Sequence, residues 1–440
     1  MYCGNCLRDN ALVGALRQLG HRTRMVPLYL PMRLEQADNS AGTPLFFGGV
    51  NVYLEQKSAL FRATPRWLHR LFDAPGLLAW ASGRAARTRA RDLGPLTLSM
   101  LRGELGHQAR ELDELVNWLK TSAEADVVCL SNALLAGLAR RIKAELGLPV
   151  VCFLQGEDSF LNALPDYHRE TAWRTLAERA AEIDLFIAPS HYFGDLMRER
   201  LNLPAECVRV VYNGIKLDGY GDAEGRPPKP NAEGRQVLGY FARMCPEKGL
   251  DTLVEAFLIL KKQEQHKKLT LRVGGGLGPA DKKFVKSLRR KLEQAGLAGQ
   301  YEFCPNLTLA AKQDFYRSLS VLSVPALYGE AFGLYIIEAL ASAVPVVQPE
   351  VAAFPELIKE TGGGLLCKPG DPQALADALA QLLQSPDYSR GLGATGRRGV
   401  LRDFSIETMA RNVAKLCQDV ASKRPAPAKP DARATPTLPG

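Results

Sequence analysis

The sequence lacks any apolar run long enough to cross a membrane as a helix. Such a span needs roughly 18 consecutive apolar residues, and no run in the 440-residue chain reaches that length. The chain also opens without a secretory signal, which would combine a basic start with a short apolar core. These two absences predict a soluble, cytoplasmic protein.

Cysteine is present, but it lacks the spacing of a disulfide framework or a zinc site. The nine cysteines are scattered, and those inside apolar runs, such as Cys129, Cys152 and Cys304, are expected to behave as small hydrophobes in a reducing compartment. Cys3 and Cys6 form a C-x-x-C pair, but no second pair follows at zinc-ligand spacing. We therefore expect neither metal binding nor redox chemistry from the pair of Cys3 and Cys6.

The chain is basic but lacks a nucleic-acid-binding module. Its formal net charge of +9 allows acidic partners, which include nucleotide diphosphates, anionic lipid surfaces and nucleic acid. A nucleic-acid reader would carry a recognised module with interleaved aromatic residues, and the sequence has none. Nucleic acid is therefore not a predicted partner.

What the chain does contain is an alternation of strand-like and helix-like segments. Short apolar runs bounded by Gly, Pro or polar loops predict strands, and amphipathic runs predict helices. This alternation predicts an α/β fold class with parallel sheets. A length of 440 residues with 46% apolar content favours two or three domains. The predicted strands are 23–29, 126–130, 149–154, 185–188, 208–212, 236–240, 269–273, 301–305 and 321–324, and the predicted helices include 10–19, 133–146, 332–342 and a final pair, 373–383 and 406–420.

One strand–loop–helix–strand stretch, 320–347, carries an informative pair of acids. Glu330 lies in the loop before the predicted helix 332–342, and Glu338 lies eight residues further on, roughly 12 Å along a helix axis. That distance is about the reach from ribose to sugar in an extended nucleotide diphosphate sugar. Free backbone N–H groups around Gly333 and Leu334 would suit phosphate. Two solvated acids on a capped surface helix would have the same spacing, so spacing alone leaves both interpretations open.

The run Glu330, Phe332, Gly333 and Glu338 resembles the E-x-F-G-x4-E signature of retaining glycosyltransferases with the GT-B fold, especially glycosyltransferase family 4. The segment 46–61 has a looser likeness to starch and glycogen synthases. The resemblance implies two Rossmann-like domains that face a cleft, with the donor held by the second and the acceptor by the first. The expected parts are a first domain 1–218, a Pro-rich linker 219–235, a second domain 236–404, a helix 405–421 that crosses back to the first domain, and a disordered tail 422–440.

The second domain supplies the expected donor site. Arg243 and Lys248 follow the strand 236–240 in a pattern that resembles the family motif G-x-x-x-R-x-x-x-x-K-G, and two cations there suit a diphosphate leaving group; solvated surface cations are the alternative. No D-x-D occurs, so neither a metal clamp nor a further cofactor is implied. The expected catalytic residues are Glu330, Arg243 and Lys248, and the expected donor-binding residues are Gly239, Gly274, Gly275, Pro305, Asn306, Gly329, Phe332, Gly333, Leu334 and Glu338.

The first domain supplies the expected acceptor side. Gln155, Glu157 and Asp158 follow the predicted strand 149–154, at the end of the strand where open α/β sheets place ligands. Many family members have a histidine at the position of Gln155. An amide cannot titrate near neutrality, so Gln155 can hydrogen-bond a sugar hydroxyl but cannot act as acid or base. Glu157 and Asp158 are equally well explained as helix-capping acids. His191, further along the first domain, is explained better as a structural group at a helix start than as a catalyst.

Two further features of the first domain stay open in the sequence. The helix 10–19 has no strand before it, although a GT-B domain normally begins with one, so the first strand is expected to be missing. The segment 62–110 is rich in Arg with Leu or Trp. It fits either an amphipathic region on an anionic membrane or a solvated helical insertion, and we favour the insertion.

The resemblance implies transfer of a sugar from a nucleotide diphosphate sugar to a glycan, lipid-linked or small-molecule acceptor, with retention and without a metal. Two alternatives remain: elongation of an α-glucan, as in glycogen and starch synthases, and a catalytically silent nucleotide-sugar-binding protein. The silent alternative is motivated by Gln155 and by the missing first strand.

Overall fold

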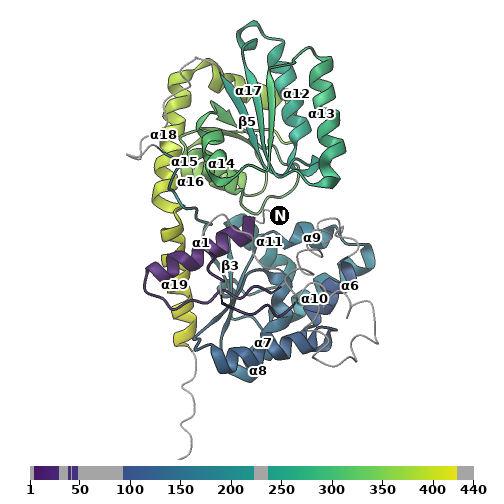
Figure 1. Ribbon diagram of the computed structural model, residues 1–440, viewed down its shortest axis with the longest axis vertical. Helices are drawn as coiled ribbons and strands as arrows, with labels where there is room; N and C mark the ends of the chain where they lie inside the picture. The colour runs from purple at the N-terminus through teal and green to yellow at the C-terminus, as the bar shows by residue number, and fades with distance from the viewer. Residues whose placement is uncertain (1–3, 29–37, 41, 48–92, 222–235, 424–440) are drawn as a thin grey trace, which may run out of the picture.

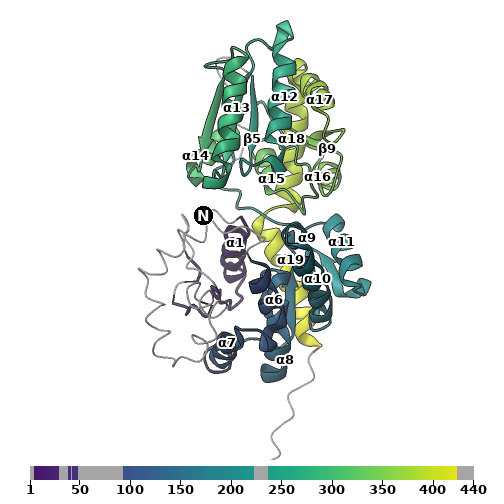
Figure 2. The same ribbon diagram turned by 90° about the vertical axis from the view of Figure 1, so that its right-hand side faces the viewer.

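The computed structural model describes residues 4–28, 38–40, 42–47, 93–221 and 236–423. They form two α/β domains that follow one another along the long axis of the molecule (Figures 1 and 2). Each domain has one parallel sheet, with the strand orders β1-β2-β3-β4 and β10-β9-β8-β5-β6-β7. The predicted fold class, α/β with two Rossmann-like domains, is confirmed.

The first domain is built on a four-stranded sheet that is covered on both faces. Its strands are β1 (Val128–Leu130), β2 (Val150–Phe153), β3 (Leu185–Ala188) and β4 (Val208–Val210). Its helices are α1 (Gly4–Gln18), α6 (Gly94–Arg102), η2 (Gly103–Leu105), α7 (Ala109–Ser122), η3 (Ala133–Leu138), α8 (Ala139–Leu146), α9 (Glu157–Asn162), α10 (Asp166–Ala180), α11 (His191–Leu201) and η4 (Ala205–Cys207).

Alternate residues of the central strands serve two different cores, because successive strand side chains point to opposite faces. On β2, Val151 and Phe153 pack with α1 and with the last helix of the chain, α19 (Ile406–Ser422). Val150 and Cys152 of the same strand face the opposite core, to which α6, α7, α8, α10 and α11 contribute. Burial on both faces explains why these strands are continuous apolar runs.

The second domain is built on the six-stranded sheet, with β5 and β8 at its centre. Its strands are β5 (Val237–Phe241), β6 (Thr270–Gly275), β7 (Tyr301–Pro305), β8 (Val321–Leu322), β9 (Val346–Pro349) and β10 (Gly364–Cys367). Its helices are η5 (Pro246–Lys248), α12 (Leu250–Lys261), η6 (Glu264–His266), η7 (Pro279–Asp281), α13 (Lys282–Gln294), α14 (Leu309–Arg317), α15 (Leu334–Ala341), α16 (Phe354–Thr361), α17 (Pro372–Gln384) and α18 (Pro386–Asp403).

The last two helices run along the side of both domains (Figure 1). Helix α18 packs on α15 and α16 of the second domain, and α19 packs on α1 of the first. The chain passes between the domains at Ser405, which forms an isolated parallel bridge with Ile215. The last helix therefore returns to the domain in which the chain began.

The expectation of only two final helices is wrong, because α18 lies between them. Its sequence contains several glycines, which disfavour helices. The packing explains them: a Cβ at Gly393 would overlap the carbonyl oxygen of Ala343, and one at Gly399 would meet the backbone of Thr361. Glycine is therefore needed where α18 approaches neighbouring backbone closely.

The predicted strand 23–29 is also wrong over its described part, since residues 23–28 have no strand assignment. The side chains of Val26 and Leu28 pack against the first-domain core instead. Within the described residues, no strand pairs with the outer edge of β1, and the expected absence of a first strand stays a prediction. The segment 46–61 lies largely outside the described residues, as do the linker, the tail and the Arg-rich segment up to residue 92.

The described end of the Arg-rich segment is partly buried, because Leu98 and Leu101 of α6 lie in the first-domain core.

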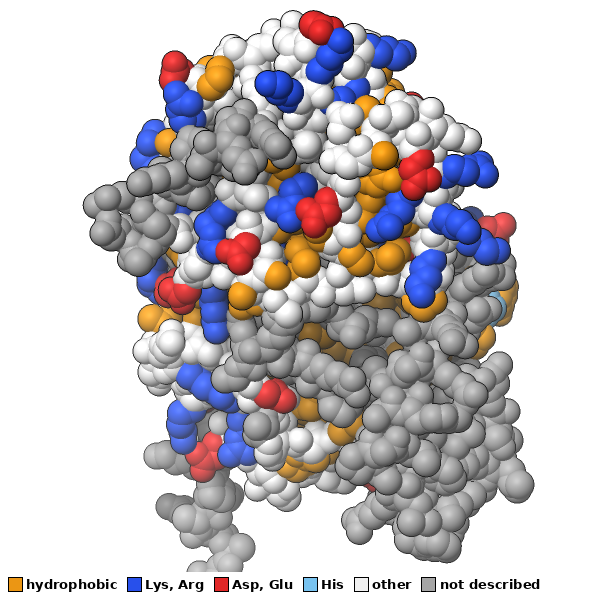
Figure 3. All heavy atoms as spheres, turned by 45° about the horizontal axis from the view of Figure 1, so that its top comes forward, with side chains coloured by type: hydrophobic (Ala, Val, Ile, Leu, Met, Phe, Trp, Pro, Cys, Tyr) orange, Lys and Arg blue, Asp and Glu red, His pale blue; other side chains and the backbone are white. Residues whose placement is uncertain are grey.

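On the second domain, Lys and Arg side chains are interspersed with Asp and Glu over the face seen in Figure 3. Among the described helices, none combines the length and the apolar character needed to cross a bilayer.

Candidate functional site

The centre of the candidate site is an ion pair between Lys248 and Glu330, which are 82 residues apart in the sequence. Lys248 ends η5, in the loop after β5, and Glu330 lies in the loop between β8 and α15. Because β5 and β8 are parallel neighbours, their carboxyl ends bring these two loops together. Each side chain is only 17% exposed, so the pair is largely removed from water.

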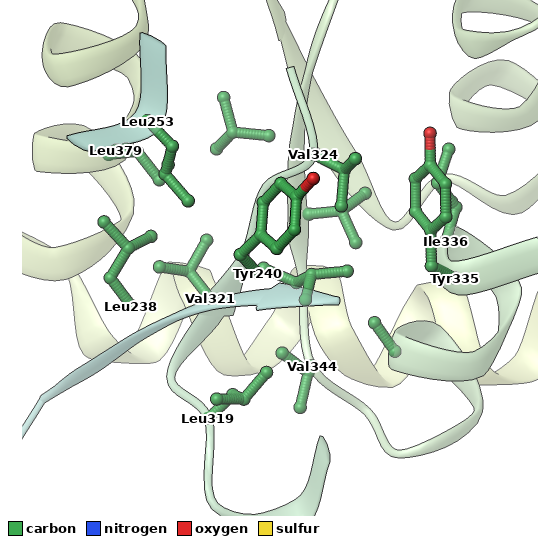
Figure 4. Close-up of a cluster of buried hydrophobic side chains, with 14 of the residues drawn as sticks. Leu238, Tyr240, Leu253, Leu319, Val321, Val324, Tyr335, Ile336, Val344 and Leu379 are labelled. Atoms are coloured by element: carbon green, nitrogen blue, oxygen red, sulfur yellow. The ribbon is translucent and has the colours of Figure 1, made fainter. Parts of the chain in front are cut away.

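Aromatic side chains surround this ion pair. The ammonium nitrogen of Lys248 lies 5.0 Å from the centre of the Tyr328 ring, and the hydroxyl of Tyr335 donates to Glu330 Oε2 at 3.3 Å. Burial disfavours the charged lysine, but the negative charge of Glu330 and its hydrogen bond to the ammonium act against burial, and the pKa of Lys248 is raised. Lys248 therefore stays a fixed positive charge. Figure 4 shows Tyr240 among the buried apolar side chains and Tyr335 beside Ile336 at their edge, with both hydroxyls pointing toward the top of the view.

Arg243 is held in the same loop by an acid that the sequence did not single out. Its Nε donates to Asp281 Oδ2 at 3.1 Å, and its backbone carbonyl accepts from the Tyr240 hydroxyl at 2.9 Å. The Arg243 side chain is largely exposed, whereas Asp281 is buried. Asp281 thus orients the guanidinium while leaving part of it accessible to a ligand.

Glu338 lies on α15 and is also paired. Lys312 of α14 forms an ion pair with its Oε1, and the buried hydroxyl of Tyr316 donates to its Oε2 at 2.8 Å. Burial, followed by the charge of Glu338, raises the pKa of Tyr316, so the tyrosine remains a donor. The ammonium of Lys312 is 5.8 Å from the centre of the Phe241 ring at the end of β5. Glu338 therefore lies on the same side of the sheet as the Arg243 loop.

The N-terminus of α15 lies between the two acids. Gly333 is its N-cap residue and has a φ of +100°, a left-handed conformation that glycine adopts without strain. Leu334 begins the helix, and the first N–H groups of a helix have no acceptor within it. The expected helix end is thus present in the residues that follow Glu330, and its binding of an anion stays a prediction.

The glycine-rich loop after β6 is held against neighbouring backbone. A Cβ at Gly274 would meet the Phe241 ring, and one at Gly275, where φ is +119°, would overlap the carbonyl of Ala242. β7 ends at Pro305, which pairs in register with Gly275. The next residue is Asn306, and the N–H of Asn306 donates to Gly275 O at 2.8 Å. These residues lie beside the Arg243 loop, and their contact with a donor stays a prediction.

Three other expected donor residues have clear packing roles. Gly239 is inside β5, where a Cβ would overlap Leu319. Phe332 is buried, with its ring centre 6.4 Å from that of Tyr212. A Cβ at Gly329 would meet the hydroxyl of Tyr192 from the first domain. Whether any of them also touches a donor stays a prediction.

On the first-domain side, Gln155 and Glu157 are engaged by their own domain. Gln155 Nε2 donates to Ser131 O at 2.8 Å. Glu157 is buried, and its two oxygens accept from the N–H groups of Gln155 and Ala133, both at 2.8 Å. Burial raises the pKa of Glu157, although these amides act in the opposite direction. The structure thus gives Glu157 the alternative role, in which it caps backbone amides.

Asp158 is the first-domain acid that faces Glu330. Burial is the main cause that raises the pKa of Asp158, and the negative charge of Glu330 raises it further. Within the described part of the chain, the buried Oδ1 of Asp158 has no hydrogen-bond partner. Of the three predicted acceptor-side residues, Asp158 therefore has the clearest capacity for a new contact.

The start of α11 joins the two domains. Ser190 caps this helix and donates its hydroxyl to Ala331 O of the second domain at 2.7 Å. Glu356 of α16 accepts from the N–H groups of His191 and Tyr192, at 2.8 and 3.1 Å. His191 is the first residue of α11, as expected of a structural group at a helix start.

The loop before α16 contains an alanine in a conformation that favours glycine. Ala352 has a φ of +57°. We expect Ala352→Gly to raise the free energy of unfolding by about 1 kcal/mol, because glycine relieves the left-handed strain. Chemical denaturation measures the change. Ala353, with a φ of −77°, is the control: Ala353→Gly should destabilise, and equal effects of both variants would contradict the explanation.

Several residues of this site were not found from the sequence. They are the partners of the predicted ones, and they come from other elements: Asp281, Lys312, Tyr316, Tyr328, Tyr335 and Tyr192. Their residue types are common on any surface, so no sequence signal marked them.

Within the described ranges, no group of three or more His, Cys, Asp or Glu is arranged to hold a metal ion.

Family models match both domains of the chain. The model described as "Glycosyltransferase Family 4" matches residues 81–218, and the one described as "Glycosyl transferases group 1" matches residues 222–399. The first match covers the strands β1 to β4, and the second covers β5 to β10.

The curated relatives match over part of their length. A D-inositol 3-phosphate glycosyltransferase of Streptomyces scabiei is 29% identical over 287 residues, which are 61% of this chain and 62% of the relative. The lipopolysaccharide core biosynthesis mannosyltransferase LpsB of Rhizobium meliloti is 30% identical over 223 residues, 48% of this chain and 62% of the relative. The chain thus spans about half to three fifths of the length of such relatives.

Solved structures share the two-domain fold. Anabaena Alr3699/HepE in complex with UDP superposes with a TM-score of 0.61 at 19% identity, over 72% of this chain and 84% of that one. The sucrose-phosphate synthase of Thermosynechococcus elongatus superposes with a TM-score of 0.59 at 22% identity, over 71% and 79% of the two chains. At such identities the likeness establishes the fold.

Proposed function

This chain is a GT-B protein that resembles glycosyltransferase family 4, and on that premise we propose that it transfers a sugar from a nucleotide diphosphate sugar to a hydroxyl acceptor. The observation that carries the proposal is the placement of Lys248, Glu330 and the N-terminus of α15 around one point, with Arg243 in the same loop as Lys248. Glu338 lies further along the same helix.

The proposed reaction breaks the bond between the anomeric carbon and the diphosphate through an oxocarbenium-like state. Negative charge then accumulates on the leaving phosphate. Lys248, Arg243 and the N–H groups at the start of α15 supply preorganised positive potential there, which is the kind of stabilisation worth most in a site shielded from water. The donor diphosphate would replace Glu330 as a partner of Lys248.

The two acids take different roles in this proposal. Glu330, freed from Lys248, would accept hydrogen bonds from hydroxyls of the transferred sugar. Glu338 would bind the ribose hydroxyls, with Lys312 and Tyr316 fixing its orientation. The acceptor would enter from the first domain, where Asp158 has a buried oxygen free to accept from an acceptor hydroxyl. Retention of the anomeric configuration is part of the proposal through the family resemblance.

A thermal-shift screen with UDP-, GDP- and ADP-sugars tests donor binding. A donor present at 100 times its Kd stabilises the folded state by about 2.7 kcal/mol, so one nucleotide should raise the Tm clearly above the other two. The preferred donor is then incubated with inositol phosphate, lipid-linked and glycan acceptors. Release of the nucleoside diphosphate with sugar transfer supports the proposal. Donor binding without transfer to any acceptor contradicts it and supports a silent binding protein, and incorporation into glycogen supports glucan elongation.

Metal independence forms a separate prediction. The two cations Lys248 and Arg243 occupy the position from which a divalent ion would neutralise the diphosphate, so we expect excess EDTA to leave the transfer rate unchanged. The check is the initial rate with EDTA and with added Mg²⁺ or Mn²⁺. A rate that falls more than ten-fold in EDTA, and returns with either ion, would show that the cations are insufficient.

A further inference from the structure

Two thiols from distant parts of the chain lie beside each other on the first domain. Cys129 is on the edge strand β1, and Cys417 is on α19, 288 residues later. Their sulfur atoms are 3.7 Å apart. Cys129 is opposite Val151 in the strand register, and Val151 packs beneath α1 and α19. The two cysteines therefore meet where the returning helix covers the edge of the sheet.

Neither residue is fully buried. The Cys129 residue is exposed, and Cys417 is partly exposed. Cys152, one strand further into the sheet, shows the contrast, because it is fully buried and burial raises the pKa of its thiol. Cys129 and Cys417 are therefore more open to a chemical oxidant than Cys152.

The contact between the two sulfurs also shifts the pKa values of the two thiols in opposite directions. Either thiol can donate to the other across this contact, and the contact lowers the pKa of Cys417 and raises that of Cys129. A thiolate is the attacking species in thiol–disulfide exchange, so Cys417 is the nucleophile and Cys129 the resolving thiol.

We propose that Cys129 and Cys417 form a reversible disulfide when the protein meets a small-molecule disulfide. The Cys417 thiolate attacks one sulfur of the reagent, forms a mixed disulfide and releases one small thiolate. The Cys129 sulfur, after losing its proton to solvent, attacks Cys417 and releases the second. Two protein thiols are oxidised and one disulfide is reduced to two thiols. The sulfurs need to close from 3.7 Å to about 2.0 Å.

The bond would tie α19 covalently to the outer strand of the first sheet. Since α19 follows directly from the second-domain helix α18, the crosslink joins residues that are 288 apart in the sequence and closes a loop that includes the whole second domain. Closing a long loop restricts the unfolded chain, so oxidation should stabilise the protein. This inference is independent of the proposed transferase activity, because none of the donor-site contacts involves either cysteine.

The test is peptide mapping of the full chain after treatment with oxidised glutathione and alkylation of the remaining thiols. Trypsin releases residues 121–140 with Cys129 and residues 416–423 with Cys417. We expect these two peptides joined, and separated again by dithiothreitol. The oxidised protein should also melt on the order of 5 °C higher than the reduced one.

Three variants make the result specific. Cys129→Ser and Cys417→Ser should each abolish the crosslinked peptide and the rise in Tm. Cys207→Ser, at another partly exposed cysteine of the first domain, should leave both intact. Complete alkylation of Cys129 and Cys417 after oxidation, or crosslinks of either residue to other cysteines, would overturn the proposal. The wild-type map decides the matter even if a serine variant fails to fold.

Discussion

Replacing Lys248 by alanine is expected to lower kcat by at least ten-fold, which corresponds to about 1.4 kcal/mol of transition-state stabilisation. Lys248 is a buried, permanently charged group whose partner in the structure is Glu330. In the proposed reaction it would pair with the leaving diphosphate, where charge develops. The measurement is the initial rate at saturating donor, with kcat and donor KM determined separately.

The loss of Lys248 also leaves Glu330 buried without its cation, which costs stability. A thermal melt must therefore accompany the kinetics. The double variant Lys248→Ala/Glu330→Gln removes the uncompensated charge: it should recover Tm but not kcat. Lys262→Ala, at an exposed position after α12, is the control and should keep both. A Lys248→Ala protein that is folded and has the wild-type kcat would remove Lys248 from the catalytic residues.

Replacing Glu338 by glutamine is expected to raise the donor KM by ten-fold or more, with a smaller change in kcat. Ribose is remote from the bond that breaks, so its contacts contribute to ground-state and transition-state binding alike, and losing such contacts changes KM rather than kcat. Glutamine keeps the size of the side chain but loses the charge that pairs with Lys312. Titration of the nucleoside diphosphate alone gives an independent measure of affinity.

The corresponding control is Glu178→Gln, an exposed acid on α10, which should leave the donor KM unchanged. Glu330→Gln provides the contrast. Because Glu330 is proposed to contact the transferred sugar, this substitution should lower kcat. If Glu338→Gln binds the nucleoside diphosphate as tightly as the wild type, while retaining its fold, the ribose assignment is wrong.

The local sequence predicted many of the strands and helices that position the candidate site. The strands 185–188 and 301–305 coincide with β3 and β7, and the helix after Glu330 was expected within two residues of α15. These segments are easy to read because buried parallel strands are apolar runs that end at Gly, Pro or polar loops. The ordered motifs then placed Arg243, Lys248 and Glu330 after strands of one sheet.

Other features could not be read from local pattern. The glycines of α18 disfavour a helix, and only the close approach of α18 to Ala343 and Thr361 accounts for them. Glu157 and Asp158 are adjacent acids, and the sequence alone does not show which of them contacts an acceptor. Burial and two backbone amides give Glu157 a structural role, whereas Asp158 faces Glu330 across the domain boundary.

The sequence by itself determined the α/β class and the order of strands, loops and motifs, because backbone preference and side-chain polarity act over a few neighbouring residues. Only the tertiary structure decided which charges meet. Lys248 contacts Glu330 because β8 lies beside β5, and Cys129 meets Cys417 because α19 returns to the first sheet. Contacts between residues far apart in the chain depend on the packing of whole elements, which no local run of residues encodes.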